Sequence, residues 1–286
     1  MSKILVTGGA GFIGTNLIIK LLESNHKIVS IDNYSIGKID NHQDGVEYID
    51  GDVCDIDKLV KNDFDYCFHL AGLSRIQPSF DYPKETFLSN TEGVLKVLDW
   101  AKNSKTKIIY SGSSSKHHNP LISPYATFKF LGEEICKLYR NAFKSNVEIV
   151  RFYNVYGPYE IIDGEWAALI GKWRGQVKNG NQLTIVGDGK QRRDFTHVHD
   201  IVDGLIKIAY SKNSSDDAWE LGTGINYSIL DVFELFKNRF NSKAEFVLNQ
   251  DGNYKETLRE TNDAIEILKW SPKDRLKEYI ENLQND

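Results

Sequence analysis

Hydrophobic residues in the first half of the chain follow two alternating periodicities. Short runs rich in β-branched residues predict strands, and these runs cover residues 4–7, 28–31, 46–49, 66–70, 108–111 and 147–151. Between them, apolar residues recur every three or four positions and indicate one buried face of a helix, as at Val94, Val97, Leu98 and Ala101. Strands and helices that alternate in this way predict βαβ crossovers, and therefore an α/β fold with a doubly wound parallel sheet over residues 1–155.

The second half, residues 156–286, loses this regular alternation. Helices are predicted near residues 166–178, 199–211, 229–240, 262–269 and 273–284, and a strand is predicted at 183–186. We therefore expect a smaller α/β C-terminal lobe, with a segment near 190–222 that returns to the first domain. Because no linker or low-complexity tract separates the two parts, a cleft is expected between the lobe and the carboxyl edge of the sheet.

Composition and charge narrow the class of protein. The chain has 286 residues, of which 41% are hydrophobic and 26% are charged, as in ordinary globular proteins. Its formal net charge of −5 gives no general attraction to nucleic acid or to an anionic membrane, and no apolar run is long enough to span a bilayer. The three cysteines, Cys54, Cys67 and Cys136, form no CxxC pair, so we expect a reducing, cytoplasmic location.

A glycine-rich segment follows the first predicted strand and opens the first helix. Gly8, Gly11 and Gly14 have GxxGxxG spacing, with Phe12 and Ile13 between the last two. Glycines at this spacing allow a tight turn, a close approach of the backbone to a pyrophosphate, and tight packing of the helix on the strand. A plain glycine-rich turn is the alternative, but the position between strand and helix favours a dinucleotide site.

The second strand ends at Asp32, near the spacing at which an acidic residue accepts hydrogen bonds from the adenosine ribose. A carboxylate there repels a 2′-phosphate, and Asn33 rather than an arginine follows it, which favours NAD over NADP. The residues after the third and fourth strands either flank the adenine and pyrophosphate or are ordinary loop residues, and they are Asp52, Val53, Leu70, Ala71 and Gly72.

Candidate acid–base chemistry follows the fifth strand. Ser123 and Pro124 are a favourable N-cap and first-turn residue, so Tyr125 and Lys129 lie at positions i and i+4 on one helix face. An adjacent ammonium stabilises a tyrosinate, which would let Tyr125 act as a base near neutral pH. Ser113, near the end of the fifth strand, could hold the substrate oxygen in line. A surface tyrosine and lysine on an amphipathic helix are the alternative.

Taken together, these motifs resemble the extended short-chain dehydrogenase/reductase family, and within it the NAD-dependent nucleotide-sugar epimerases and dehydratases. The resemblance covers nearly the whole chain, with TGGAGFIG at 7–14, IDN at 31–33, GDVCD at 51–55, HLAG at 69–72, SPYATFK at 123–129, RFYNVYGP at 151–158 and IVGDGKQRRDFTHVHD at 185–200. It implies a Rossmann-type fold with NAD as the cofactor. It also implies that the C-terminal lobe binds a nucleoside diphosphate sugar.

The resemblance assigns roles to single residues. Tyr125 would be the base, and Lys129 would bind the nicotinamide ribose and lower the pKa of Tyr125. Ser113 would hold the sugar hydroxyl, and Arg193 would bind the diphosphate. Two further residues would contact the substrate, Ser74 and Asn154. A homodimer is also implied, formed through helices over residues 84–103 and 124–143.

Two pairs of residues have competing interpretations. His197 and His199 lie beside two aspartates and imitate a metal site, but the resemblance makes both histidines structural, and we expect no metal. Trp166 and Trp173 lie seven residues apart on one predicted helix face. We expect them in the core rather than as a platform on which a base stacks.

The chain departs from the family pattern in three places. Dehydratases of the family carry an Asp-Glu pair where this chain has Ser114 and Ser115, so the acid and base for eliminating water are missing. Related epimerases have an arginine before a glycine near the C-terminal end, whereas residues 249–253 here read NQDGN, which weakens the expected hold on the diphosphate. The loop over 115–125 is also shorter than in similar epimerases, and it borders the expected sugar pocket.

These observations favour C4 epimerisation of a UDP-hexose, in which the C4 hydroxyl is oxidised to a transient 4-keto sugar and reduced again from the other face. Two alternatives stay open. A 4-keto-sugar reductase, or another nucleotide-sugar oxidoreductase, would consume free NADH or NADPH at each turnover. A non-catalytic nucleotide-sensing protein of the same fold is less favoured, because Ser113, Tyr125 and Lys129 are all present.

Overall fold

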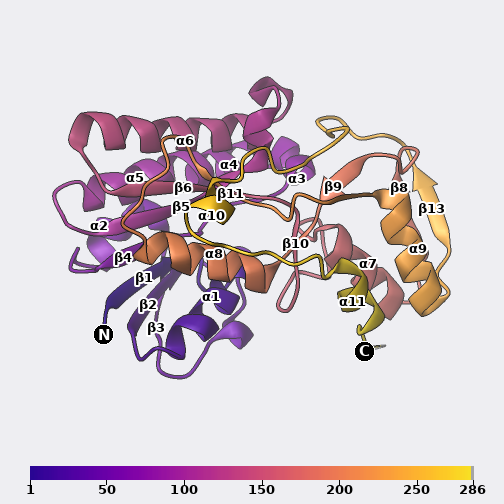
Figure 1. Ribbon diagram of the computed structural model, residues 1–286, viewed down its shortest axis with the longest axis horizontal. Coiled ribbons are helices and arrows are strands. Elements are labelled where there is room, and N and C mark those ends of the chain that lie inside the picture. The colour runs from indigo at the N-terminus through magenta and orange to yellow at the C-terminus, as the bar shows by residue number, and fades with distance from the viewer. Residues whose placement is uncertain (285–286) are drawn as a thin grey trace.

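The computed structural model describes residues 1–284 and contains a seven-stranded parallel sheet with the strand order β11-β6-β5-β4-β1-β2-β3 (Figure 1). The strands are Lys3–Thr7 (β1), Lys27–Asp32 (β2), Glu47–Asp50 (β3), Tyr66–His69 (β4), Lys107–Ser113 (β5), Val147–Phe152 (β6) and Trp219–Leu221 (β11). The first six match the predicted strands to within two residues at each end. The doubly wound α/β fold expected from the sequence is therefore confirmed.

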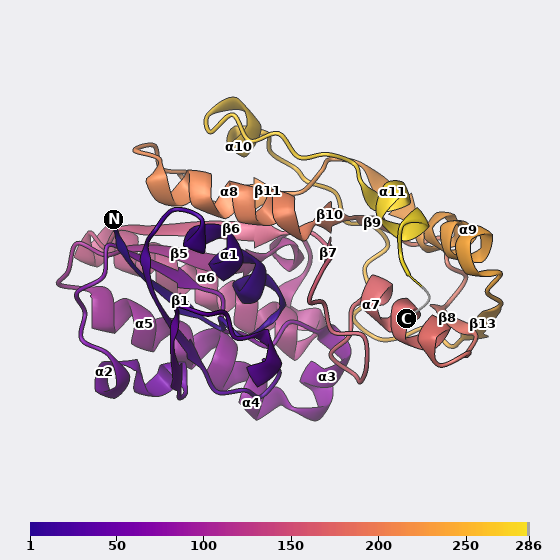
Figure 2. The same cartoon turned by 90° about the horizontal axis from the view of Figure 1, so that it is seen from below.

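Each face of the sheet is covered by helices, because successive residues of a buried strand point to opposite sides. Ile4 and Val6 belong to a core formed with α1 (Phe12–Leu22) and α8 (Val198–Tyr210). Leu5 belongs to the opposite core. Figure 2 shows α8 on one side of the sheet and three helices on the other, α2 (Ile56–Leu59), α5 (Gly93–Ala101) and α6 (Pro124–Phe143).

A smaller group of elements with its own core lies beyond the carboxyl edge of the sheet (Figure 2). Its helices are α7 (Leu169–Lys178), α9 (Ile229–Phe240) and α11 (Leu276–Glu281), and β8 (Leu183–Val186) pairs in parallel with β13 (Ala244–Val247). Two further pairs of short strands connect this lobe to the sheet, β7 (Val155–Tyr156) with β10 (Thr196–His197) and β9 (Arg192–Asp194) with β12 (Asn226–Ser228).

Three predicted helices are shorter than expected. The helix predicted from residue 166 begins at Leu169, so Trp166 lies in the preceding loop and does not share a helix face with the fully buried Trp173. Residues 262–269 form only α10, Asp263–Glu266. The last helix covers Leu276–Glu281 rather than 273–284. Tertiary contacts override the helical periodicity here, as where the Trp166 carbonyl accepts from Arg75 and the Lys273 amide donates to Asp200.

The order of the strands determines where a ligand can bind. From β1 the chain moves to β2 on one side and later to β4 on the other, so the carboxyl ends of β1 and β4 border the crevice at which doubly wound sheets bind ligands. Three short helical segments follow β4 at this edge, α3 (Ile76–Asp81), α4 (Pro83–Phe87) and a π-helical turn (Leu88–Glu92). No helix within residues 1–284 is long and apolar enough to cross a membrane.

Candidate active site

A cleft of about 650 Å³ runs between the carboxyl edge of the sheet and the C-terminal lobe. The structure brings all the residues predicted to bind cofactor or substrate, or to act in catalysis, to its walls. They are Gly8, Gly11, Phe12, Ile13, Gly14, Asp32, Asn33, Asp52, Val53, Leu70, Ala71, Gly72, Ser74, Ser113, Tyr125, Lys129, Asn154 and Arg193.

The three glycines of the first loop serve different contacts. Gly8 has a positive φ of 73°, and a Cβ there would lie 2.8 Å from the Ala71 nitrogen, whereas a Cβ at Gly14 would lie 2.2 Å from the Gly8 carbonyl oxygen. Packing within the protein thus explains both. A Cβ at Gly11 would meet only the Gly8 oxygen, at 3.2 Å, and would otherwise project toward free space. Because no side chain caps the start of α1, its first amides are available to an anion.

Asp32 lies at the end of β2, inside the loop that follows it. Its carboxylate accepts hydrogen bonds from the Ala10 amide at 3.0 Å and the Tyr34 amide at 2.9 Å. Burial raises its pKa, and these two bonds partly oppose that shift. Asn33 and Asp52, also predicted here, are joined by a 2.8 Å hydrogen bond from the Asn33 amide group to the Asp52 carboxylate. This end of the cleft therefore offers carboxylate acceptors to a ligand hydroxyl.

Tyr125, Ser113 and Lys129 form a compact group at the centre of the cleft. Ser123 caps α6 by accepting a hydrogen bond from the Ala126 amide, and this fixes the first turn in which Tyr125 lies. The Tyr125 hydroxyl donates to Ser113 Oγ at 3.1 Å. One turn further along α6, Lys129 Nζ donates to the Ser111 carbonyl at 2.9 Å, so the side chain is held against the end of β5.

Burial dominates the electrostatics of these groups. It lowers the pKa of Lys129 to about 8, so this amine can change its protonation state near neutral pH. We expected Lys129 to lower the pKa of Tyr125. Instead, burial raises the pKa of this phenol. The hydrogen bond with Ser113 and the positive charge of Arg75 oppose this effect without overcoming it.

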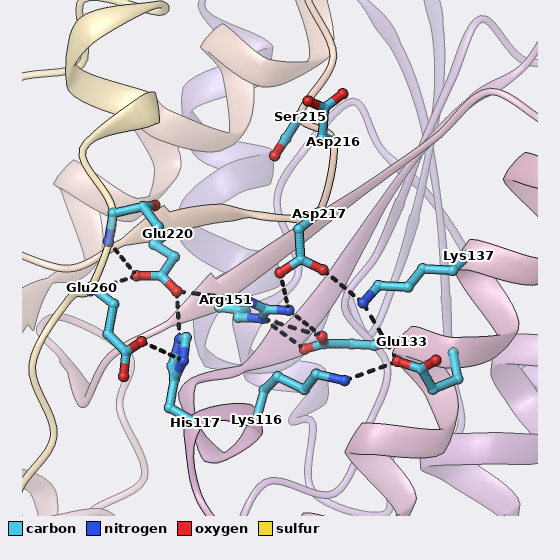
Figure 3. A network of polar contacts seen from close by, with 12 residues as sticks. Lys116, His117, Glu133, Lys137, Arg151, Ser215, Asp216, Asp217, Glu220 and Glu260 are labelled. Atoms are coloured by element: carbon cyan, nitrogen blue, oxygen red, sulfur yellow. Dashed lines mark hydrogen bonds and ion pairs between the residues drawn. The ribbon is translucent and has the colours of Figure 1, made fainter.

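A charge network around Glu133 and Arg151 (Figure 3) contacts the backbone of Ser113. Glu133, two turns after Tyr125 on α6, accepts from the Ser113 amide at 3.3 Å and pairs with Arg151 of β6 at 2.8 Å. The side chains of Glu133 and Arg151 are only 1% and 3% exposed. Arg151 also lies 2.8 Å from Asp217, which in turn contacts Lys137. The strand end that carries Ser113 is therefore fixed by an ion pair from behind.

The same network anchors the short loop after Ser113. The imidazole of His117 lies between the carboxylates of Glu220 on β11 and Glu260, which is 3.0 Å away (Figure 3). The hydrogen bond to Glu220 raises the pKa of His117, with burial acting against it. Burial alone would raise the pKa of Glu220, but His117 and two backbone amides outweigh it and hold that pKa at about 2. His118 stacks on Tyr254, with 3.8 Å between ring centroids.

The residues that the resemblance assigned to the substrate have partners within the protein. Asn154 donates to the Asp194 carbonyl at 3.2 Å and to Thr257 at 3.0 Å, so its amide joins the lobe to the end of the sheet. Within residues 1–284, the Arg193 guanidinium donates to a single acceptor, the Arg192 carbonyl at 2.8 Å, and burial lowers its pKa to about 10. Ser74 is exposed on the opposite wall of the cleft.

Three buried polar atoms of cleft residues have no hydrogen-bond partner within the described chain. They are Ser115 Oγ, the Tyr254 hydroxyl oxygen and one carboxylate oxygen of Glu160. Burying such atoms without a partner is costly, so a polar ligand that supplied hydrogen bonds to them would recover that cost. The lobe side of the cleft is thus suited to a ligand with many hydroxyl groups.

Sequence reasoning missed several cleft residues. Ser35, Ile36 and Gly37 follow Asp32 and border the same end of the cleft, and the polar turn after the second strand was the available signal. Arg75 and Glu160 carried no recognisable spacing. Tyr254 and its stack on His118 depend on two segments that are more than 130 residues apart.

His197, at the end of β10, and His199, in the first turn of α8, do not line the cleft and contribute to packing. His197 caps α8 by accepting from the His199 amide at 3.2 Å, and its ring contacts the rings of Tyr156 and Tyr279. Within the described part of the chain, no three His, Cys, Asp or Glu residues are grouped so that they could hold a metal ion.

Comparison with known proteins gives a consistent result. The sequence profile of the NAD dependent epimerase/dehydratase family matches residues 4–222. A protein of Methanocaldococcus jannaschii, provisionally named UDP-glucose 4-epimerase, is 30% identical, and the alignment covers 99% of this chain and 97% of that protein. A UDP-glucose 4-epimerase of Mycolicibacterium smegmatis is 27% identical, with 97% and 96% covered.

Solved structures show the same architecture over nearly the full length. The UDP-glucose 4-epimerase of Thermotoga maritima, solved with UDP-glucose, superposes with a TM-score of 0.89 at 26% identity, covering 98% of this chain and 96% of that one. The UDP-glucuronic acid 4-epimerase of Bacillus cereus, solved with UDP-glucuronic acid and NAD, gives a TM-score of 0.89 at 28% identity with the same coverage.

The contacts of His117 predict how stability depends on pH. Because its folded pKa lies above the unfolded value of about 6.5, its ion pairs stabilise the fold fully below that value and lose their effect as the pH rises through the folded pKa. The difference in free energy of unfolding between the wild type and His117→Gln should therefore be largest near pH 6 and shrink toward pH 9, measured by urea denaturation.

His26 provides the matched control. Burial lowers its pKa, so its contribution to stability should increase as the pH rises toward 6.5, which is the opposite sign. A stability difference for His117→Gln that stays constant from pH 6 to 9, or that follows the His26→Gln curve, would contradict the assignment.

Proposed function

The chain belongs to the NAD dependent epimerase/dehydratase family, and on this basis we propose that it interconverts the C4 epimers of a UDP-hexose while NAD stays bound in the cleft. The observation that carries this proposal is the group at the centre of the cleft. Tyr125 lies 3.1 Å from Ser113 Oγ and one helical turn from Lys129, on the wall between the glycine loop and the lobe. A general base, a hydroxyl that orients the substrate oxygen and a cation are thus assembled at one point.

The residues of the first domain fit a dinucleotide. The uncapped start of α1 and the free space beside Gly11 suit a pyrophosphate, and Asp32 suits the hydroxyls of a ribose. Lys129, at the far end of this row, would contact the ribose next to the nicotinamide. Bound NAD supplies the hydride acceptor and donor for C4 of the sugar.

The protein side of the reaction is a reversible proton transfer. Ser113 Oγ holds the C4 oxygen of the sugar, and Tyr125 Oη takes its proton as the hydroxyl becomes a ketone. Because burial favours the neutral phenol, Tyr125 needs the positive charges of Arg75 and of the bound nicotinamide to act as a base. The 4-keto sugar would then rotate in the cleft, and Tyr125 would return the proton as the opposite face of C4 is reduced.

The lobe is proposed to hold the rest of the substrate. Arg193, with no acidic partner in the described residues, would bind the diphosphate, while Asn154 and Ser74 border the sugar. We divide the chain accordingly into a cofactor-binding domain over 1–155, joined by the return segment near 190–222, and a mainly substrate-binding lobe over 156–286. Ser114 and Ser115 offer no acid or base for eliminating water, which argues against dehydration.

We further propose a homodimer in the cytoplasm. Five large apolar side chains along α4, α5 and α6 are at least 37% exposed, and they are Phe87, Leu95, Leu131, Leu138 and Phe143. An apolar surface of this kind on neighbouring helices suits a partner helix pair from a second copy. The three cysteines are free, which supports a reducing compartment.

Incubation of the protein with UDP-hexoses and no added NADH tests the main proposal. NMR of the products should show interconversion of C4 epimers, without a 4-keto-6-deoxy sugar and without a stoichiometric change in NADH absorbance. Tyr125→Phe keeps the ring and should lower turnover by about 10² to 10⁴-fold, the scale of one general base. Turnover that requires NADH in each cycle would instead identify a reductase.

Asp32 is expected to select the cofactor. Asp32→Ala should weaken NAD binding roughly tenfold, the value of about one charge-assisted hydrogen bond, as measured by titration calorimetry on cofactor-free protein. NADP should bind the wild type more weakly than NAD, because its phosphate meets the carboxylate. Equal binding of NADP and NAD by the wild type would refute this role.

The proposed dimer surface can be tested by charge insertion. Leu138→Glu places a carboxylate on a side chain that is 54% exposed in the monomer, and light scattering coupled to size exclusion should show a fall from two chains to one. Leu248→Glu is the control, since Leu248 is 90% exposed on the lobe and should leave the mass unchanged. A wild-type protein that runs as a single chain would rule out the dimer.

A further inference from the structure

Arg75 places a positive charge on the cleft wall without a protein counter-ion. Its Nε donates to the Trp166 carbonyl at 3.0 Å, and one Nη donates to the Ser74 carbonyl at 2.8 Å. These bonds orient the guanidinium toward two neutral acceptors. Among the ion pairs of residues 1–284, none involves Arg75, so no carboxylate oxygen of the described chain lies within 4.0 Å of it.

The acidic residue that shares this region, Glu160, already has a partner. Its carboxylate lies 3.0 Å from Arg174 and accepts from Tyr279, and burial raises its pKa to about 7. Glu160 is thus paired with Arg174, and its attraction to Arg75 acts over a distance longer than an ion pair. Burial lowers the pKa of Arg75, but a guanidinium stays protonated near neutral pH. Arg75 is therefore a half-buried, oriented cation whose charge is available to a ligand that supplies a negative group.

The position of Arg75 decides which part of a ligand it meets. Arg75 precedes α3 in the segment after β4, close enough to Tyr125 for its charge to lower the pKa of that phenol. The diphosphate would meet cations of the lobe, Arg193 and Lys172, which also line the cleft and form no ion pair in the described residues. The sugar carbon that reacts lies at Tyr125, and the neighbouring C5 carries the exocyclic C6. The anion that reaches Arg75 is therefore on the sugar.

We propose that the preferred substrate is a nucleoside diphosphate hexuronic acid, whose C6 carboxylate is bound by Arg75. The planar guanidinium can donate hydrogen bonds to both oxygens of a carboxylate side by side, and a neutral hydroxymethyl group cannot accept such a pair. This inference rests on the proposed epimerase function and specifies its substrate. Arg75 is then the residue that distinguishes an acidic hexose from a neutral one.

Paired measurements on UDP-glucuronate and UDP-glucose test this assignment. For the wild type, kcat/KM should favour UDP-glucuronate at least about tenfold. Arg75→Gln should reduce that ratio by about 10²-fold, the loss for a buried charge pair that loses one member. Dissociation constants of the two nucleotide sugars do not depend on proton transfer to Tyr125, and they should show the same change in preference. Arg75→Lys keeps the charge and should recover part of the preference.

A control separates the sugar from the diphosphate. UDP alone, used as a competitive inhibitor, should bind wild type and Arg75→Gln equally but bind Arg193→Ala more weakly. Equal losses for both sugars in Arg75→Gln, or a wild type that prefers UDP-glucose, would overturn the proposal for Arg75.

The two proposals can fail separately. Epimerisation of UDP-glucose with no preference for UDP-glucuronate would leave the epimerase standing and refute the role of Arg75. If neither sugar is converted, the epimerase fails, and dissociation constants decide on Arg75: tighter binding of UDP-glucuronate than of UDP-glucose, lost in Arg75→Gln, supports it, and equal binding refutes it.

Discussion

The arrangement of the candidate active site depends on a buried ion pair between a helix and a strand. Glu133 of α6 and Arg151 of β6 are almost completely shielded from water, and the Glu133 carboxylate is balanced there by Arg151, which also pairs with Asp217. Tyr125, Lys129 and Glu133 follow each other at four-residue intervals, so the contact that fixes Glu133 also fixes the face of α6 that carries the other two. The same carboxylate holds the Ser113 amide. This ion pair therefore positions both Ser113 and the face of α6 that carries Tyr125 and Lys129.

The positive charge in the cleft comes from two sources, backbone amides on the sheet side and arginine side chains elsewhere. The glycine loop offers backbone amides and needs no basic side chain, because the start of α1 supplies the positive end of a dipole. The lobe and the loop after β4 instead contribute arginines, Arg193 and Arg75, whose partners in the protein are carbonyl groups. Carbonyls orient a guanidinium without neutralising it, so its charge stays available to a ligand.

The sequence was sufficient to predict the sheet and those cleft residues that belong to a short motif. Strand periodicity, the GxxGxxG loop and the i, i+4 relation of Tyr125 and Lys129 are all encoded over a few neighbouring positions. Arg75 and Tyr254 could not be found in this way, because their environment comes from segments far apart in the chain. The early start predicted for the helix at residue 166 has a related cause, since Trp166 has helical spacing but its backbone carbonyl accepts the Arg75 hydrogen bond in the preceding loop.

The anchoring of the short loop through His117 has a consequence for synthesis on the ribosome. The loop that carries Ser113 and Ser115 is complete before the middle of the chain, but its anchors Glu220 and Glu260 are translated much later. The parallel sheet from β1 to β6 can form as these segments emerge, whereas this loop gains both of its ionic contacts only after Glu260, in the last tenth of the chain, has been made. A nascent chain thus carries a nearly finished sheet before it carries a finished catalytic centre.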